Sequence, residues 1–342
     1  MNDLASTGGF GSRSGRLGEV DALKGVGILL VVLIHSLRPT WDPGISGTEL
    51  WLGYVTRFAV PGFFAASGYL YSSKHGIPRD LVRRRLTRLL VPYLVASLAA
   101  QVFFLVSSVP PPQGPIWRQL VLGGSFGAYY FVFILVLFIA ASPVLARLST
   151  RSIGLLLIPL LVAQFLLETG TIPVTNFFWY LRNPFLWGGY FVLGWWIRLH
   201  RTAIVDSLAL RRRSWLVFTG GTWLALVTLL AFSGALPPLA VKTVSWLTIF
   251  ATLAVCFVAS AERQLSESVM GPLRWLSDAS YPIYLFHLFF VVSVARMVRM
   301  DRGVFEPGVL LVVWGCGVVG PVVLLWSARK LLKGRSRTLL GA

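Results

Sequence analysis

The sequence has few charged residues, and acidic ones are especially scarce. Only 13% of its 342 residues are charged, with 13 Asp and Glu against 31 Lys and Arg. A soluble domain carries about 25% charged residues. The hydrophobic share is 56% and the mean hydropathy is +0.73. This composition argues against a soluble domain and predicts a protein that crosses a lipid bilayer several times.

Cysteine is almost absent too. Cys256 and Cys316 both lie in apolar runs, which excludes a disulfide framework and cysteine-based metal spacing. No other cluster of metal-ligand residues occurs, so we expect no metal and no bound cofactor. The net charge of +18 does not by itself indicate nucleic-acid binding, because that requires a basic patch on a soluble fold. We therefore expect a lipid bilayer, and no nucleic acid, as a partner.

Carboxylates are missing from the middle of the apolar segments, and Glu168 stands at the end of one such segment. Proton-coupled transporters usually keep acidic residues at mid-membrane depth. This absence argues against proton coupling. It leaves open an uncoupled flippase or transporter for a lipid-linked sugar.

Apolar windows long enough to cross a bilayer predict an all-α polytopic membrane protein with about ten transmembrane helices. The windows are 20–39, 51–71, 89–109, 128–146, 152–168, 184–199, 214–233, 239–260, 280–298 and 307–328. Most Lys and Arg fall on the N-terminal side of the membrane, which places both termini in the cytoplasm. The expected domains are a polar cytoplasmic tail (1–19), one transmembrane domain (20–328) and a basic cytoplasmic tail (329–342).

Three basic residues in the first two predicted spans are candidates for a functional role. Lys24 and His35 are eleven positions apart, about 16 Å along a helix, or roughly half the hydrocarbon core. Arg57 is expected at a depth similar to that of His35, so a polar cavity opening outward would serve both. A neutral packing histidine and an arginine that snorkels to the interface are the alternatives.

Two further features stand nearer the cytoplasmic side. Arg85 and Arg88 are three positions apart, so on a helix they share one face and suit a phosphate-bearing ligand. Simple anchoring to anionic lipid is the alternative. His287 follows the start of the predicted 280–298 span by a few residues, so we expect it in the inner half of the membrane, away from His35.

Four segments together resemble the acyltransferase-3 family of integral-membrane enzymes, in particular its surface-polysaccharide O-acyltransferases and sugar O-acetylases. The segments are Lys24 to His35, the run Arg57-Phe58-Ala59-Val60-Pro61-Gly62-Phe63-Phe64-Ala65-Ala66-Ser67-Gly68-Tyr69-Leu70, Arg85-Leu86-Thr87-Arg88 leading to Pro92-Tyr93, and Ser280-Tyr281-Pro282-Ile283-Tyr284-Leu285-Phe286-His287. Where the family often has His-x-Trp-Phe-Leu, this chain has Ala128-Tyr129-Tyr130-Phe131-Val132, so contacts made by that histidine or tryptophan are not carried over.

The resemblance implies transfer of an acyl group, with acetyl expected, from acyl-coenzyme A as co-substrate to a carbohydrate hydroxyl. His35 would be the general base or an acylated nucleophile, and Arg57 would stabilise charge or orient the sugar. Lys24, Arg85 and Arg88 would bind the donor. Supporting roles are expected for Asp21, Ser67, Tyr69, Tyr284 and His287. The implied location is a bacterial-type inner (plasma) membrane, with multiple passes. An inactive scaffold is disfavoured because Lys24 and His35 keep the family spacing.

Overall fold

The computed structural model describes residues 17–38, 45–73, 76–107, 109–168, 170–209, 266–298, 306–332 and 335–341, with a few positions between 221 and 229. Over these residues the fold is helical and contains no strand, as predicted. The main helices are α1 (Gly18–Ser36), α2 (Gly47–Thr56), α3 (Ala59–Tyr71), α4 (Arg79–Val106), α5 (Ile116–Val121), α6 (Tyr130–Leu145), α7 (Thr150–Glu168), α8 (Phe177–Leu181), α9 (Pro184–Leu199), α10 (Arg201–Ala209), α13 (Glu267–Met297), α14 (Pro307–Leu332) and α15 (Arg335–Leu340).

Five helical segments among the described residues are long and apolar enough to span a membrane. They are Arg79–Val106, Gly127–Leu145, Thr150–Glu168, Glu267–Met297 and Pro307–Leu331, and each contains most or all of a predicted span. The predicted spans 214–233 and 239–260 lie almost wholly outside the described residues. The number of ten spans and the cytoplasmic termini therefore stay predictions.

The predicted span 51–71 is not one helix. It consists of α2 and α3, which meet at Arg57 and Phe58. The Arg57 N–H donates to the Tyr54 carbonyl in a tight turn, 3.2 Å apart. Pro61 has no N–H with which to continue the α-helical hydrogen bonds of α2. The break places Arg57 at a helix end, where its side chain can turn toward the interior.

Two helices begin earlier than predicted, and the second changes where a site residue lies. Helix α4 starts at Arg79, so Arg85 and Arg88 belong to the same continuous helix as its apolar part. Helix α13 starts at Glu267 and continues through Pro272 and Pro282. His287 consequently lies deep along α13. The expectation that it stands near the start of a helix, away from His35, is wrong.

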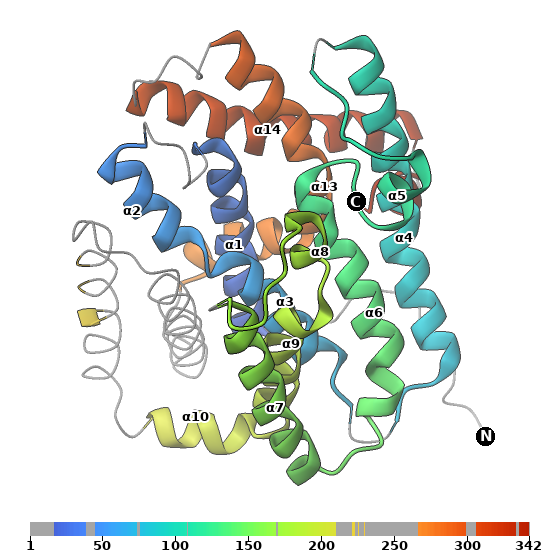
Figure 1. Cartoon of the computed structure of the whole chain (residues 1–342), viewed down its shortest axis with the longest axis vertical. Coiled ribbons are helices and arrows are strands. Elements are labelled where there is room, and N and C mark those ends of the chain that lie inside the picture. The colour runs from blue at the N-terminus through green and yellow to red at the C-terminus, as the bar shows by residue number, and fades with distance from the viewer. Residues whose placement is uncertain are drawn as a thin grey trace.

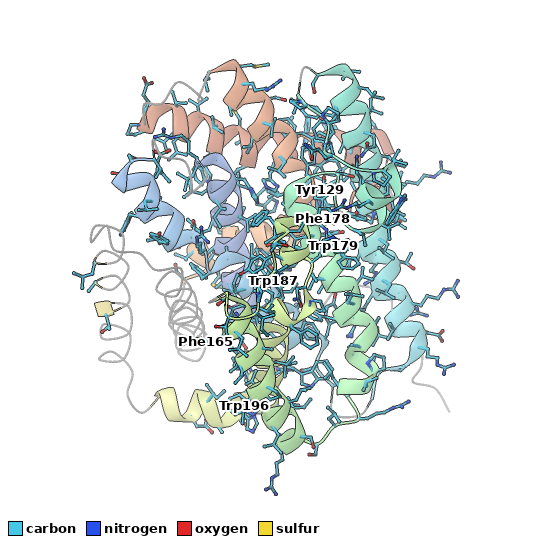
Figure 2. The ribbon with its side chains drawn as sticks, viewed as in Figure 1. Tyr129, Phe165, Phe178, Trp179, Trp187 and Trp196 are labelled. Carbon is cyan, nitrogen blue, oxygen red and sulfur yellow. The ribbon has the colours of Figure 1, made fainter. Side chains whose placement is uncertain are left out.

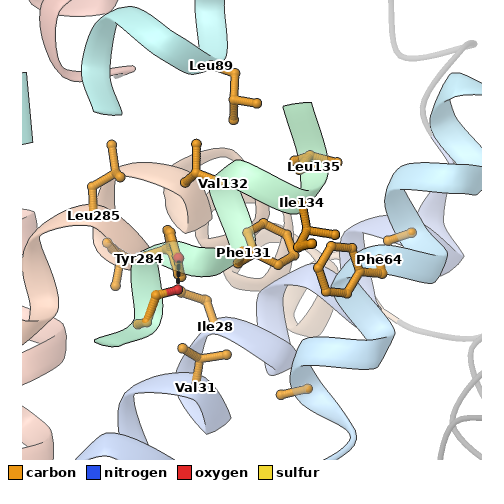
Figure 3. Packing of buried hydrophobic residues seen from close by; sticks show 14 of the residues in the cluster. Ile28, Val31, Phe64, Leu89, Phe131, Val132, Ile134, Leu135, Tyr284 and Leu285 are labelled. Atoms are coloured by element: carbon orange, nitrogen blue, oxygen red, sulfur yellow. Dashed lines mark hydrogen bonds between the residues drawn. The ribbon is translucent and has the colours of Figure 1, made fainter. Parts of the chain in front are cut away.

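The helices cross closely at a few positions (Figure 1). Helix α1 packs along α13, and α3 packs along α9. At the second crossing, Gly68 and Gly194 let the two backbones meet, because a Cβ on either would lie 1.8 Å from a carbonyl oxygen of the other helix. Between α3 and α6 the core is aromatic, and the ring centroids of Phe64 and Phe131 lie 4.5 Å apart. Figure 3 shows both rings within this packing. This packing surrounds the cavity described next.

Candidate active site

A cavity of about 1080 Å³ lies between the helices. Drug-sized ligands occupy pockets of about 300–1000 Å³, so this cavity has room for a large substrate or for two. Both Lys24 and Arg38 line it, and they stand near opposite ends of α1. The cavity therefore follows α1 for roughly 20 Å. The residues that line it and carry polar or aromatic groups are Lys24, His35, Arg38, Arg57, Ser67, Tyr71, Arg85, Arg88, Tyr130, Glu168, Tyr180, Trp187, Tyr190, Ser280, Tyr281 and Tyr284.

One end of the cavity is basic. Lys24, Arg85 and Arg88 line it together. Their predicted role in binding one donor stays a prediction. The Arg85 guanidinium carbon lies 4.6 Å from the centroid of the Tyr71 ring, and Arg85 Nη1 is buried with no hydrogen-bond partner among the described residues. A buried donor without an acceptor is costly. The position therefore favours an anionic ligand that supplies one.

The other end is rich in aromatic rings. The Arg57 guanidinium carbon lies 5.9 Å from the centroid of the Tyr54 ring. The Tyr130 and Trp187 rings are stacked, with their centroids 5.5 Å apart. The Trp187 indole N–H donates to the Leu181 carbonyl over 2.8 Å, which joins α9 to the short α8. Figure 2 shows Trp187 near the middle of the view. Flat rings and an arginine suit a polar ligand with apolar faces, such as a sugar.

Arg182 stabilises the segments that form this end of the cavity. Its guanidinium donates to the carbonyls of Leu122, Gly123 and Phe178 over 2.6, 2.6 and 2.9 Å. The carbon of that group lies 3.5 Å from the Phe178 ring centroid. Burial lowers the pKa of Arg182 to about 10, which leaves it charged at neutral pH. Arg182 is thus a structural clamp between the loop before α6 and the segment that carries α8.

His35 lies on the cavity wall, at the level of the α1–α13 contact. Its ring centroid is 5.2 Å from that of His287, which is fully buried. The structure thus joins two residues that the sequence had placed at different depths. Between the basic and aromatic ends, the cavity presents His35 as a group able to accept a proton.

Besides His287, the predicted supporting residues divide into two groups. Ser67 and Tyr284 line the cavity, but their hydroxyls donate to the carbonyls of Phe63 and Ala128. Asp21 and Tyr69 do not line it. Asp21 accepts from Ser277 over 2.8 Å, and Tyr69 donates to Glu19 over 2.8 Å. These last two connect helices, and the arrangement gives them no contact with a ligand in the cavity.

Several cavity residues were not predicted. Tyr71, Tyr130, Tyr180, Trp187 and Glu168 all face the cavity. Tyr180 and Trp187 have one sequence signal, the density of aromatic residues at 177–187, in a predicted outer loop and the span that follows. Over the described residues, no three His, Cys, Asp or Glu side chains gather as metal ligands would.

The helices and the cavity define a multi-pass membrane protein with one chamber that is basic at one end and aromatic at the other. A family model described as an acyltransferase domain matches residues 17–328, nearly the whole chain. The chain therefore belongs to the acyltransferase-3 family and is a membrane acyltransferase. No curated protein and no solved structure matches it.

Proposed function

We propose that this acyltransferase moves an acyl group, most simply acetyl, from acyl-coenzyme A to a hydroxyl of a carbohydrate. The observation that supports this best is that one cavity is lined by all the residues the reaction would need. They are Lys24, Arg85 and Arg88 for the donor, His35 for the proton, and Arg57 and Trp187 for the sugar. The donor's phosphates would meet the basic end, and its extended thiol arm would reach toward His35. The sugar would enter from the aromatic end.

The proposed chemistry is a direct transfer. His35 takes the proton of the acceptor hydroxyl as its oxygen forms a bond to the thioester carbonyl carbon. The carbon–sulfur bond then breaks, and the proton on His35 passes to the coenzyme A sulfur. Arg57 stabilises the oxyanion that develops on the carbonyl oxygen. The basic end would face the cytoplasm of a bacterial-type inner membrane, where acyl-coenzyme A is available.

Transfer from radiolabelled acetyl-coenzyme A to membranes of the producing cells tests this proposal, because no acceptor needs to be chosen beforehand. We expect label in carbohydrate that mild alkali releases, since an O-ester is labile under conditions that leave an amide intact. Succinyl-coenzyme A serves as a second donor. Label stable to alkali would indicate N-acylation. Consumption of neither thioester, with labelled lipid-linked sugar crossing the bilayer, would instead favour a flippase.

A further inference from the structure

His287 is the buried histidine that lies behind His35. Its side chain is fully buried and is absent from the cavity wall, whereas His35 lines the cavity. The two ring centroids are 5.2 Å apart with the ring planes at 45°. The order from cavity to interior is thus His35 and then His287. A base with a second polar group directly behind it is the usual arrangement of an oriented general base.

The hydrogen bonding of His287 determines its tautomer. His287 Nδ1 lies 2.7 Å from the Tyr284 carbonyl oxygen, one turn earlier on α13. A carbonyl oxygen only accepts, so Nδ1 must carry a hydrogen and donate it. In the neutral ring Nε2 is then an acceptor. Nε2 is buried and has no hydrogen-bond partner among the described residues.

Three polar groups on α1, α13 and α14, the helices that pack against one another here, already have acceptors. The Ser36 hydroxyl donates to the Val32 carbonyl over 2.8 Å, and the Tyr284 hydroxyl donates to the Ala128 carbonyl. The Trp314 indole N–H donates to the Leu29 carbonyl over 3.0 Å. At a centroid separation of 5.2 Å, a ring nitrogen of His35 and Nε2 of His287 can come within hydrogen-bond distance of each other.

We infer that His287 is a positioning residue: its Nε2 accepts the N–H of His35, so that the other nitrogen of His35 faces the cavity as the free base. The inference rests on the proposed role of His35. During transfer the acceptor proton would go to the cavity-facing nitrogen, and the imidazolium of His35 would keep its N–H bond to His287. When that proton leaves with the coenzyme A sulfur, both rings return to their starting tautomers. His287 gains and loses no proton, and no other reactant is required.

Nuclear magnetic resonance of the ring nitrogens tests the hydrogen bond without any transfer reaction. The chain has 4 histidines, at 35, 75, 200 and 287, so the signals of isotope-labelled full-length protein can be assigned from single substitutions. We expect one tautomer for His35 and an Nε2 signal of His287 shifted as for a hydrogen-bond acceptor. In His287→Phe, which keeps an aromatic ring but has no nitrogen to accept, the His35 nitrogen signals should move toward the average of two tautomers. In His287→Gln, whose amide oxygen can accept, they should stay near those of the wild type.

His200→Phe is the matched control. His200 Nδ1 also donates to a carbonyl one turn earlier, that of Trp196, over 2.9 Å, but this histidine does not line the cavity. The control should leave the His35 signals unchanged. Unchanged His35 signals in His287→Phe would overturn the inference. If His287→Phe does not fold, the wild-type protein alone still gives a test. A His287 Nε2 signal typical of a nitrogen without a hydrogen bond would also overturn the inference.

Kinetics give a second readout, measured as coenzyme A released from acetyl-coenzyme A in the presence of producing-cell membranes. His287→Phe should lower kcat by about 10-fold or more, as expected when a base loses its orienting partner, while the donor KM stays within about twofold. His287→Gln should recover most of kcat. Equal losses in both variants would mean that His287 only packs. Absence of all release by the wild type would defeat the proposed function, whereas the nitrogen signals would still decide whether the two histidines are hydrogen-bonded.

Discussion

The guanidinium carbon of Arg85 lies 4.6 Å from the centroid of the Tyr71 ring, across the basic end of the cavity. The aromatic face holds the cation without supplying a hydrogen-bond acceptor, so Arg85 Nη1 is left for a ligand. Helix α4 and the end of α3 are thereby joined at the point where an anionic donor would bind.

Arg85→Ala should raise the donor KM more than the acceptor KM. Loss of a charge-assisted phosphate contact costs about 1.5–3 kcal/mol, or about 10–150-fold in KM. Arg84→Ala is the matched control, because Arg84 is exposed on the same helix and does not line this cavity. Initial rates at varied acetyl-coenzyme A concentration give the donor KM of both variants, and rates at varied acceptor concentration give the acceptor KM. An unchanged donor KM in folded Arg85→Ala protein would leave the arginines as lipid anchors.

His35→Gln should lower transfer by about 10²–10⁴-fold, the usual contribution of a positioned general base. The amide keeps the size and hydrogen bonding of the side chain, so the amount of inserted protein should not change. His200→Gln serves as the control and should transfer at the wild-type rate. Near-full transfer by His35→Gln would show that another group takes the hydroxyl proton.

Gly68→Ala and Gly194→Ala should each destabilise the crossing of α3 and α9. The new methyl group would lie 1.8 Å from the carbonyl oxygen of Phe191 or Ala65, so the helices would have to separate. Such overpacking costs about 1–3 kcal/mol. Gly315→Ala in α14 is the control, since its Cβ would meet nothing within 4 Å. Thermal unfolding in detergent compares them, and equal melting temperatures would contradict the close crossing.

Glu49 should make stability depend on pH. Burial would raise its pKa, but hydrogen bonds from Arg38 and Ser46, with the charge of Arg38, outweigh this and hold the pKa below its ordinary value of 4.5. The stabilisation is therefore complete above about pH 4.5 and is lost as the pH falls through the lowered pKa. Glu49→Gln should melt earlier than the wild type at pH 7, and the difference should shrink toward pH 3. A difference that does not change with pH would assign the effect to packing.

The predicted topology places the 39–50 loop outside and the 72–88 loop inside. Single cysteines at Ser73 and at exposed Thr48, in a chain whose Cys256 and Cys316 are replaced by alanine, should react with a membrane-impermeant reagent from opposite sides. Thr48 is preferred to Ser46, whose hydroxyl caps α2. Labelling of both positions from the same side would disprove this orientation.

The sequence alone determined that this is a helical membrane protein, because long apolar runs leave the backbone few other ways to satisfy its hydrogen bonds in lipid. Its motifs indicated the acyltransferase-3 family. It also singled out Lys24, His35, Arg57, Arg85 and Arg88 as candidate site residues, and all five line one cavity. Lys24 and His35 lie on one helix, so the constant rise per residue predicts their separation. The same holds for Arg85 and Arg88 on α4.

Only the tertiary structure decided which residues of different helices meet. The early start of α13 and its packing along α1 bring His287 against His35, although 252 positions separate them in the sequence. The break at Arg57 divides a predicted single span into α2 and α3, each of which packs against α1. Asp21 and Tyr69 turned out to connect helices because their partners, Ser277 and Glu19, lie on other helices. Such contacts depend on helix crossing and rotation, which hydropathy and local spacing do not encode.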